Sequence, residues 1–456
     1  MAEGSRKLNM SELVAVAIVL TAVFGNFAIA DISIMGITPT YYRVIIPVLF
    51  FICAFLNWKN GSRIILVKDR NVIVNKAFFL MGLIWVLYGA VSVMISPWSS
   101  LGSGAKELLG IVWGFLSVYV IITLCMKGQI GNVIVAMKTV LAVALLIGYI
   151  EVFSGWHMGV SRLSDPAYIA LLYELYPDAE IDVFMHNVAT AFFYNQNDYC
   201  AFLTIMSPLC LYYKSDSCLI NRVLHYAGLA LVFMMLLIDD SFICTIAFIM
   251  GAIFYLVFAK ASWRQWLVTS AVIAAVRLLG NNVVNAVFYI IPGGAEIQMA
   301  KLNASLGAQL ANMEAGSGSL LYRINTYTIS IAETFTQSKG FGLGAGSFVN
   351  YFAEDAERRK MMSNPHSLWL EIFSQYGIII FLLVIAVFIL VFIEMFRLLK
   401  KTDHHIPTMI TSMGICLIVA CFAPSNFLGG SYYWIVFGLA LGVISENKTR
   451  EREFFK

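Results

Sequence analysis

Charge is scarce in this sequence. Lys, Arg, Asp and Glu make up 12% of its 456 residues, about half of their share in soluble globular domains. Apolar residues account for 60%, which leaves too little polar surface to solvate several globular domains. The composition therefore excludes a soluble multidomain protein, a disordered chain and a collagen-like fibre. It indicates a helical protein that crosses a membrane many times, because the apolar runs are continuous and the strands of a membrane β-barrel would alternate.

Cysteine is missing from the two long segments between apolar runs, 155–197 and 291–366. Disulfides therefore do not stabilise these segments, and the eight cysteines elsewhere show no CxxC or other zinc-binding spacing. Seven of them lie in or beside apolar runs, where cysteine behaves as a small core residue. The sequence thus predicts neither a disulfide scaffold nor a metal centre, and it suggests no other cofactor.

Twelve apolar runs are candidates for transmembrane helices. A helix needs about 20 apolar residues to cross the hydrocarbon core, and it satisfies the backbone hydrogen bonds that lipid cannot. The weakest candidate is 198–213, which is short and is interrupted by Pro208. We therefore expect an all-α polytopic protein with one integral membrane domain over residues 1–456. Its spans are expected near residues 12–30, 41–57, 77–96, 107–126, 132–154, 198–213, 221–238, 241–259, 266–290, 367–396, 406–423 and 431–445.

Positive charge is distributed unevenly between the expected loops. With twelve spans, twenty Lys and Arg residues fall on one side, while the short loops on the other side hold only Arg43 and Lys106. Because cytoplasmic loops are enriched in basic residues, both termini are expected to be cytoplasmic, and segments 155–197 and 291–366 to be outer loops. An alternative for the N-terminus is a signal peptide that ends at Ala28-Ile29-Ala30. Its removal would leave the remaining topology unchanged.

The second outer loop contains a predicted helix and a glycine run. Residues 319–336 are amphipathic, with Arg323 and Tyr327 on one face and apolar residues on the other. In the run Gly340–Gly346 every second residue is glycine. No Gly-Lys-Ser/Thr follows and no strand precedes it, so a nucleotide-binding loop is not expected. Two interpretations remain: a tight turn in which backbone segments pack closely, or backbone amides that face an anionic ligand.

His366 is the strongest candidate for acid–base chemistry. Histidine takes up a proton near neutral pH, and this one follows Pro365 at the expected start of the tenth span. The alternative is a histidine that only bonds to local backbone at a helix start. His157 and His186 also lie in the outer loops, but no spacing marks them as metal ligands.

Several arginines are expected on the outer side or within the membrane. Arg277 lies inside the ninth apolar run, where a charged side chain is costly and usually faces a cavity or a partner. We expect it to contact an anion, or to pair with a buried acid or with carbonyl groups. Arg323, Arg162 and Arg43 are further outer-side cations. Arginines, one base and no metal site suit a large anionic leaving group such as a diphosphate.

Acidic residues offer fewer candidates. Asp239 and Asp240 occupy the expected outer turn between the seventh and eighth spans. They are typical of tight turns, and two acids there could also bind the hydroxyl groups of an acceptor. Asp178, Glu180 and Asp182 in the first outer loop are more typical of a solvated acidic face than of a metal site.

The layout and three motifs together resemble the bacterial O-antigen ligase and polysaccharide polymerase superfamily. The layout is similar in its twelve spans, cytoplasmic ends and dominant outer loop between spans nine and ten. The similar motifs are Arg323 followed by Gly340–Gly346, His366-Ser367 followed after nine residues by Gly377, and Phe193–Asn197, which is similar to an Asn-x-Asn element that enters span six.

The sequence departs from this superfamily at two positions. Ile380 stands three residues after Gly377, where relatives usually have Gly, Thr or Tyr. Phe242 follows Ser241 at the outer turn before span eight, where many relatives have Arg. A cation expected near the lipid diphosphate is therefore absent there, and Arg277 or Arg162 is a candidate to replace it.

The resemblance implies a metal-independent, inverting glycosyltransferase with a GT-C-like helical fold, in the bacterial cytoplasmic membrane with its active site outside. The donor would be a glycan on undecaprenyl diphosphate, and the acceptor a lipid-linked glycan or a lipid A core, as in a polysaccharide polymerase or an O-antigen ligase. His366 would deprotonate the acceptor hydroxyl, and Arg323 and Arg277 would stabilise the departing diphosphate. Glycan-assembly proteins are expected partners, and nucleic acid is not. A transporter or flippase, and a non-catalytic partner of a glycan-export complex, are the alternatives.

Overall fold

The computed structural model describes most of the chain. The described residues are 40–59, 73–175, 188–212, 218–290, 319–353, 366–400, 405–424 and 430–454, with the single positions Val14, Ala17, Thr21, Met185, His186 and Leu428. The predicted first span, 12–30, apart from Val14, Ala17 and Thr21, and parts of both outer loops thus lie outside the described residues.

The described residues form an all-helical assembly, as the continuous apolar runs predict. In chain order its elements are α2 (Tyr41–Lys59), α3 (Ile73–Ile95), α4 (Leu101–Met126), α5 (Ile130–Ser154), the 3₁₀ turn η2 (Arg162–Ser164), α6 (Pro166–Leu175), α8 (Gln196–Met206), α9 (Pro208–Leu211), α10 (Leu219–Ile238), α11 (Phe242–Phe258), α12 (Trp263–Ile290), α14 (Ser319–Ser338), α15 (Ser347–Ala353), α17 (Leu368–Leu399), α18 (His405–Ala420) and α19 (Ser431–Phe454).

Six of these helices are long and apolar enough to cross a membrane: α2, α3, α4, α5, α10 and α17. Helices α11 and α18 are apolar but shorter. The weakest predicted span is divided at Ser207, because Pro208 begins the separate short helix α9. A polytopic helical membrane protein is therefore supported by the described residues, while the number of twelve spans stays a prediction.

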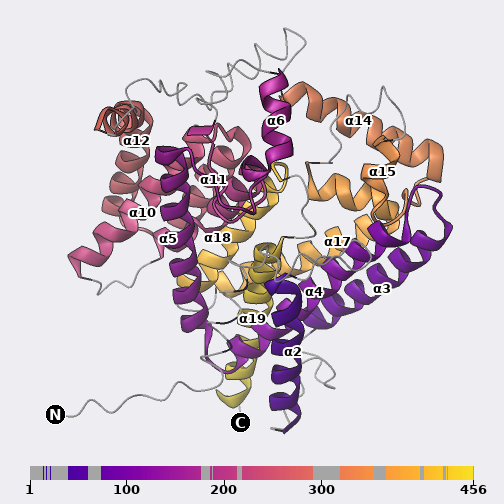
Figure 1. Ribbon diagram of the computed structural model, residues 1–456. Coiled ribbons are helices and arrows are strands. Elements are labelled where there is room, and N and C mark those ends of the chain that lie inside the picture. Colours follow the sequence, from indigo (N-terminus) through magenta and orange to yellow (C-terminus); the bar gives the residue numbers. More distant parts are fainter. Residues whose placement is uncertain are drawn as a thin grey trace.

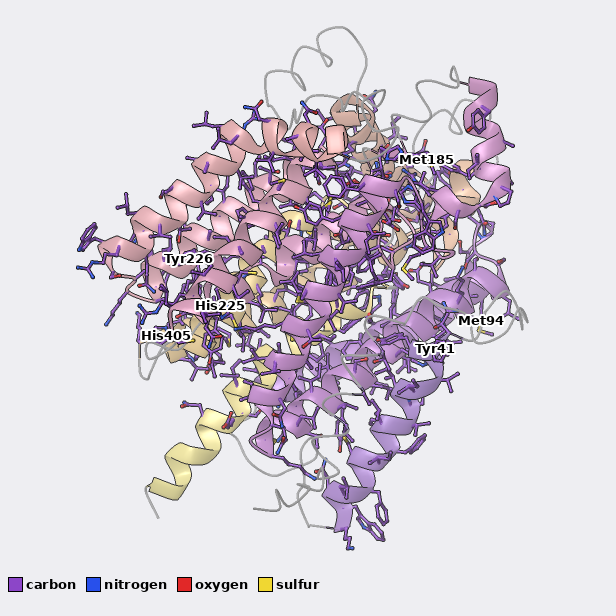
Figure 2. All side chains as sticks on the ribbon, turned by 60° about the vertical axis from the view of Figure 1, so that its left-hand side comes forward. Tyr41, Met94, Met185, His225, Tyr226 and His405 are labelled. Atoms are coloured by element: carbon purple, nitrogen blue, oxygen red, sulfur yellow. The ribbon has the colours of Figure 1, made fainter. Side chains whose placement is uncertain are left out.

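The outer surface of the bundle is apolar, as lipid contact requires. Helix α3 exposes Leu80, Leu83, Leu87, Val91 and Met94, which recur at helical spacing on one face. Figure 2 shows Met94 at the end of this helix, away from the centre of the molecule. Seven of the eight cysteines are buried and Cys218 is exposed, and none forms a disulfide.

The long helices are held together by close contacts between small and large residues. Helix α19 packs along α4, where a β-carbon on Gly114 would lie 2.1 Å from the Trp434 ring. Small residues allow helix backbones in membranes to approach closely. Figure 1 shows the C-terminal end of α19 at one end of the molecule and α6, α14 and α15 at the opposite end.

Helix α17 is broken at Gly377, which has φ 74° and ψ −179°. The ring centroids of Trp369 and Phe388 are 5.2 Å apart, although 19 residues of straight helix would separate them by about 28 Å. A short arm (residues 368–376) therefore folds back beside a long arm (residues 378–399). The expectation of one uninterrupted span over 367–396 is wrong in this respect, because a positive φ interrupts the helix at a residue that has no β-carbon.

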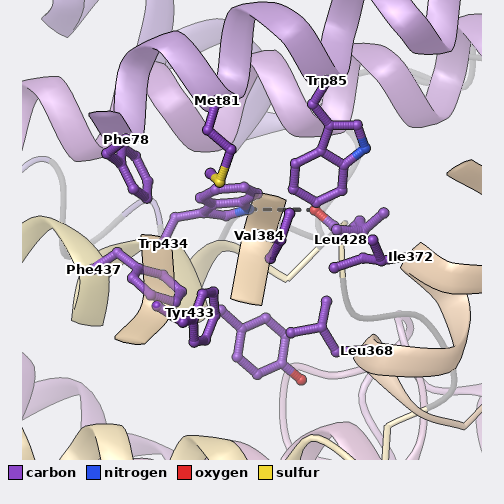
Figure 3. Close-up of a pocket in the computed structure, with 11 residues that line it drawn as sticks. Phe78, Met81, Trp85, Leu368, Ile372, Val384, Leu428, Tyr433, Trp434 and Phe437 are labelled. Atoms are coloured by element: carbon purple, nitrogen blue, oxygen red, sulfur yellow. Dashed lines mark hydrogen bonds between the residues drawn. The ribbon is translucent and has the colours of Figure 1, made fainter. Parts of the chain in front are cut away.

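Both arms of α17 pack against α3 and α19 in the hydrophobic core. Figure 3 shows Leu368 and Ile372 of the short arm close to Val384 of the long arm, below Trp85 and Trp434. The space that these apolar side chains enclose measures about 30 Å³, little more than one water needs. The short arm, which begins directly after His366, is thus firmly packed.

Candidate active site

His366 lies between the segment that follows α18 and the start of α17. Its Nδ1 is 3.3 Å from the carbonyl oxygen of Ala423. A carbonyl oxygen only accepts, so Nδ1 carries the proton and Nε2 of the neutral ring is the basic nitrogen. Within the described residues, no hydrogen bond occupies Nε2. His366 also has a positive φ of 46°, and such backbone strain concentrates at functional sites.

The environment of His366 favours its neutral form. Its pKa is lowered from 6.5 to about 4, first by burial, then by the positive charge of Arg323 and, to a smaller extent, of Arg162. The contact with Ala423 opposes this shift. At neutral pH the ring is therefore uncharged and the lone pair of Nε2 is available, and the same lowering of the pKa makes this nitrogen a weaker base than that of an exposed histidine.

Helix α14 supplies Arg323 and Tyr327, which lie one turn apart on the same face. Nη1 of Arg323 donates to the carbonyl oxygen of Phe422 at 2.8 Å, and the Tyr327 hydroxyl donates to the carbonyl oxygen of His366 at 3.1 Å. Burial lowers the pKa of Arg323, but a guanidinium stays charged near neutral pH. The face predicted from the 319–336 pattern thus points inward, while Ile324 and Ile331 on the other face are exposed.

Arg162 reaches the same region from η2 in the first outer loop. Nη2 donates to Oε1 of Gln196 at 2.6 Å, and the guanidinium lies 5.2 Å from the centroid of the Tyr168 ring. Gln196 is the first residue of α8, whose N-cap is Asn195, with Oδ1 accepting from the Asp198 amide at 3.0 Å. The motif Phe193–Asn197 therefore begins α8 and holds Arg162.

The two guanidinium groups are suited to an anion. The Nε atoms of both Arg162 and Arg323 are buried without a hydrogen-bond partner. In the part of the chain that the structure describes, no carboxylate pairs with either of them. A group of three His, Cys, Asp or Glu residues that could hold a metal ion is not found among the described residues. The arrangement offers a neutral base beside two arginines with unused donors, which fits a phosphate-containing ligand.

The other predicted arginines lie elsewhere. Arg277 is exposed on α12, which packs on α10 and lies at the edge of the molecule away from α14 and α17 (Figure 1). Arg43 is half-buried near the start of α2, where its carbonyl oxygen accepts from Nε1 of Trp113 at 2.6 Å. The structure therefore assembles His366, Arg323 and Arg162, and it does not place Arg277 with them as the sequence led us to expect.

Asp239 and Asp240 form the turn between α10 and α11. Asp239 is buried, and its two oxygens accept hydrogen bonds from the amide of Ala189 at 2.7 Å and the thiol of Cys200 at 3.3 Å. Burial is the main reason that its pKa is raised well above the ordinary value. Asp240 is exposed and has a φ of 49°. Asp239 therefore ties the turn to the first outer loop, and only Asp240 is accessible to an acceptor.

The glycine run is a tight turn whose amides are all used within the protein. Each amide from Gly340 to Ser347 donates to a protein oxygen, so none is left for an anion. The acceptors are, in order, Thr334 O, Ser338 O, Ser338 Oγ, Ser374 O, Gln375 O, Ser92 Oγ, Glu107 Oε2 and Gly344 O. A β-carbon on Gly377 would lie 2.4 Å from the carbonyl oxygen of Gly340. The close packing of the run thus explains the glycine that follows His366-Ser367 after nine residues.

Two carboxylates with important contacts are missing from the sequence prediction. Glu107 contacts the glycine run and the short arm of α17. Glu151 is buried at the end of α5 and accepts from the amides of Thr190 and Ala191, each at 2.7 Å. Both occur inside predicted apolar runs, and an acid within a membrane-spanning segment is itself a sign of a specific partner.

Comparison with known proteins finds a similar bacterial protein. The chain is similar to the teichuronic acid biosynthesis protein TuaE of Bacillus subtilis (strain 168), with 21% identity over 392 residues. The similarity covers 81% of this chain and 72% of TuaE. No family model matches the chain.

Proposed function

We propose that the protein is a membrane glycosyltransferase that transfers a glycan from a polyprenyl diphosphate carrier to a sugar hydroxyl at the outer leaflet. The observation that carries the proposal is the cluster of one neutral histidine and two arginines with unused donors. It lies in a helical bundle suited to a lipid-linked substrate. The similarity to TuaE supports a role in polysaccharide synthesis.

The cluster provides both groups that such a transfer needs. Nε2 of His366 accepts the proton of the acceptor hydroxyl as its oxygen attacks the anomeric carbon. The bond from that carbon to the diphosphate oxygen breaks, its electron pair stays on the diphosphate, and the configuration is inverted. Arg323 and Arg162 stabilise the charge that develops on the leaving group. The negative charge is thus balanced by guanidinium groups, and the reaction is expected to proceed without a metal ion.

Arg162 takes the place of the cation that relatives carry at the position of Phe242. It approaches from the first outer loop, whereas the missing arginine would approach from the start of α11. Its Nε has no partner, and its charge acts on His366. Arg277 lacks this proximity, so Arg162 is the better candidate of the two that the sequence offers.

Transfer by the purified full-length protein tests the proposal. The assay combines an undecaprenyl-diphosphate-linked repeat unit with a lipid-linked acceptor and follows the glycan product by gel and mass spectrometry. His366→Ala is expected to reduce transfer by about 10²–10⁴-fold, the usual contribution of a positioned base. His186→Ala is the matched control, because His186 also lies in an outer loop and contacts a carbonyl oxygen, that of Val152 at 2.8 Å. Equal activity of the two variants would contradict the role of His366.

A chelator added to the same assay tests the role of a metal ion, and a deletion strain tests which acceptor is used. Activity that persists in excess chelator supports the arginine-based mechanism, and loss that Mg²⁺ or Mn²⁺ restores contradicts it. We favour polymerisation over ligation. A deletion strain should then accumulate single lipid-linked repeat units, whereas long chains that are not attached to an acceptor would indicate ligation. Unchanged glycan would favour a transport function.

A further inference from the structure

Glu107 joins two segments that are far apart in the sequence. Its Oε2 accepts from the amide of Gly346 at 3.1 Å, and its Oε1 accepts from the hydroxyl of Tyr376 at 2.6 Å. The side chain of Gln375 makes a further hydrogen bond to the carboxylate. Glu107 lies near the start of α4, so a third element of the bundle holds the glycine run and the end of the short arm together.

These two segments are the continuations of the elements that carry the candidate active site. The glycine run follows α14, which supplies Arg323 and Tyr327. The short arm begins directly after His366 and ends at Tyr376, next to the break at Gly377. The run and the arm also contact each other, because the amides of Leu343 and Gly344 donate to the carbonyl oxygens of Ser374 and Gln375 at 2.7 and 2.9 Å.

Glu107 does not itself reach the reacting groups. The short arm has nine residues, which in a helix span about 14 Å, and Glu107 binds its far end. Any effect of Glu107 on the reaction must therefore pass through the placement of α14 and of the short arm.

We propose that Glu107 is a positioning residue that sets the distance between His366 and Arg323 by fixing the far ends of the two elements that carry them. This inference rests on the proposed transferase function. A carboxylate suits the task because its two oxygens accept from several donors at once. The donors come from the backbone of the run, from the Tyr376 hydroxyl and from the Gln375 amide.

Three variants separate positioning from general stability. Glu107→Ala leaves the Gly346 amide and the Tyr376 hydroxyl without their acceptor. Glu107→Gln keeps the shape and one accepting oxygen, and its amide can donate to the Tyr376 oxygen. Ile111→Ala is the matched control, because Ile111 is fully buried one turn further along the same helix and makes none of these contacts.

The transfer assay reads the effect on the site. We expect Glu107→Ala to lower kcat by at least about tenfold, in the range that misplaced catalytic groups cost, and Glu107→Gln to recover most of it. The pH at which kcat falls on the acid side should also change, because it follows the pKa of His366. The groups that face His366 are Arg323 and Tyr327 on α14, Arg162 in η2 and the carbonyl of Ala423. If Arg323 is displaced, the pKa of His366 and the midpoint of this fall should rise from about 4 towards the ordinary value of 6.5. A Glu107→Ala protein whose kcat and whose midpoint at acid pH match those of Ile111→Ala overturns the proposal.

Hydrogen exchange tests the same inference without relying on activity. In the purified full-length protein, Glu107→Ala should speed exchange in the glycine run and, beyond it, in α14 and the short arm, whereas Ile111→Ala should not. Faster exchange confined to Gly346 would overturn the proposal. If the wild-type protein transfers no glycan from any donor, the proposed function fails, while the exchange measurement still decides whether Glu107 positions these elements.

Discussion

At the scale of single residues, the candidate site depends on keeping His366 uncharged. Burial is the largest cause of its lowered pKa, and Arg323 is the second. Because the folded protein holds the pKa near 4, well below 6.5, the neutral base should persist through the mildly acidic range. An unperturbed histidine would already be half protonated at pH 6.5.

The rate of transfer should therefore be nearly constant from pH 8 down to about 5 and fall at lower pH, with a midpoint at about 4. Arg323→Gln removes a positive charge and keeps a polar side chain, so the midpoint of its residual activity should move upward. Single-turnover rates across this range, with the protein returned to pH 7 to check that it remains folded, provide the measurement. A wild-type midpoint near 6.5 would show that His366 is exposed to solvent during the reaction or is not the base.

Arg162 is predicted to act through its guanidinium fork as well as its charge. Arg162→Ala should reduce transfer by about 10²–10³-fold, the usual cost of one donor to developing negative charge. Arg162→Lys restores the charge without the fork, so only part of the rate should return. Arg277→Ala serves as the matched control, because Arg277 is exposed on α12. A larger loss for Arg277→Ala than for Arg162→Ala would contradict the site described above.

At the scale of elements, the break in α17 gives the candidate site its form. The short arm returns along the long arm, so that His366 lies beside the segment after α18 instead of extending α17 towards the outside. The break requires a positive φ at Gly377 and close approach to Gly340 and Phe341, where a β-carbon would lie 2.4 Å from each. Glycine is therefore required at this position for two independent reasons.

Gly377→Ala is accordingly expected to destabilise the protein by about 2–6 kcal/mol, since a residue with a β-carbon at this φ and ψ costs roughly 1–3 kcal/mol and overpacking about 1–3 kcal/mol. Gly131→Ala is the control, because Gly131 lies in α5 with open space where a β-carbon would stand, and alanine is the better helix former. Thermal unfolding in detergent should show a lower midpoint for Gly377→Ala and an equal or higher one for Gly131→Ala. Equal midpoints for both variants would mean that the break is not a fixed feature of α17.

The elements differ in how far the sequence can predict them. Long apolar runs indicate helices because lipid leaves the backbone no other partner, and α14 follows from a periodic pattern. The run 367–396 contains Glu371, Ser374 and Gln375 before Gly377 and is continuously apolar for many residues after it, but neither these polar residues nor a single glycine shows that the chain reverses there. The sequence likewise does not show which residue Arg162 contacts, because Gln196 is distant in sequence and any polar residue on the outer side could have bonded to Arg162. Contacts between elements depend on packing, which a single sequence does not display.

At the scale of the whole molecule, the mechanism requires that the site face the outside. The predicted topology places Lys214 and Arg222 on the cytoplasmic side, near the start of α10. Cys218 lies between them and is exposed, while the other seven cysteines are buried. The natural sequence therefore contains a single accessible thiol that reports on the cytoplasmic side, and Thr336, exposed on α14, offers a position on the opposite side.

A membrane-impermeant maleimide should label Cys218 in inside-out vesicles and not in right-side-out vesicles. In a Cys218→Ser background, Thr336→Cys should show the reverse pattern, because α14 belongs to the predicted second outer loop. Cys218→Ser alone should remain unlabelled in both preparations, which checks that the buried thiols do not react. Labelling of Cys218 from outside would show that the topology is the opposite of the predicted one. His366, Arg323 and Arg162 would then face the cytoplasm, and transfer at the outer leaflet would be impossible for this protein.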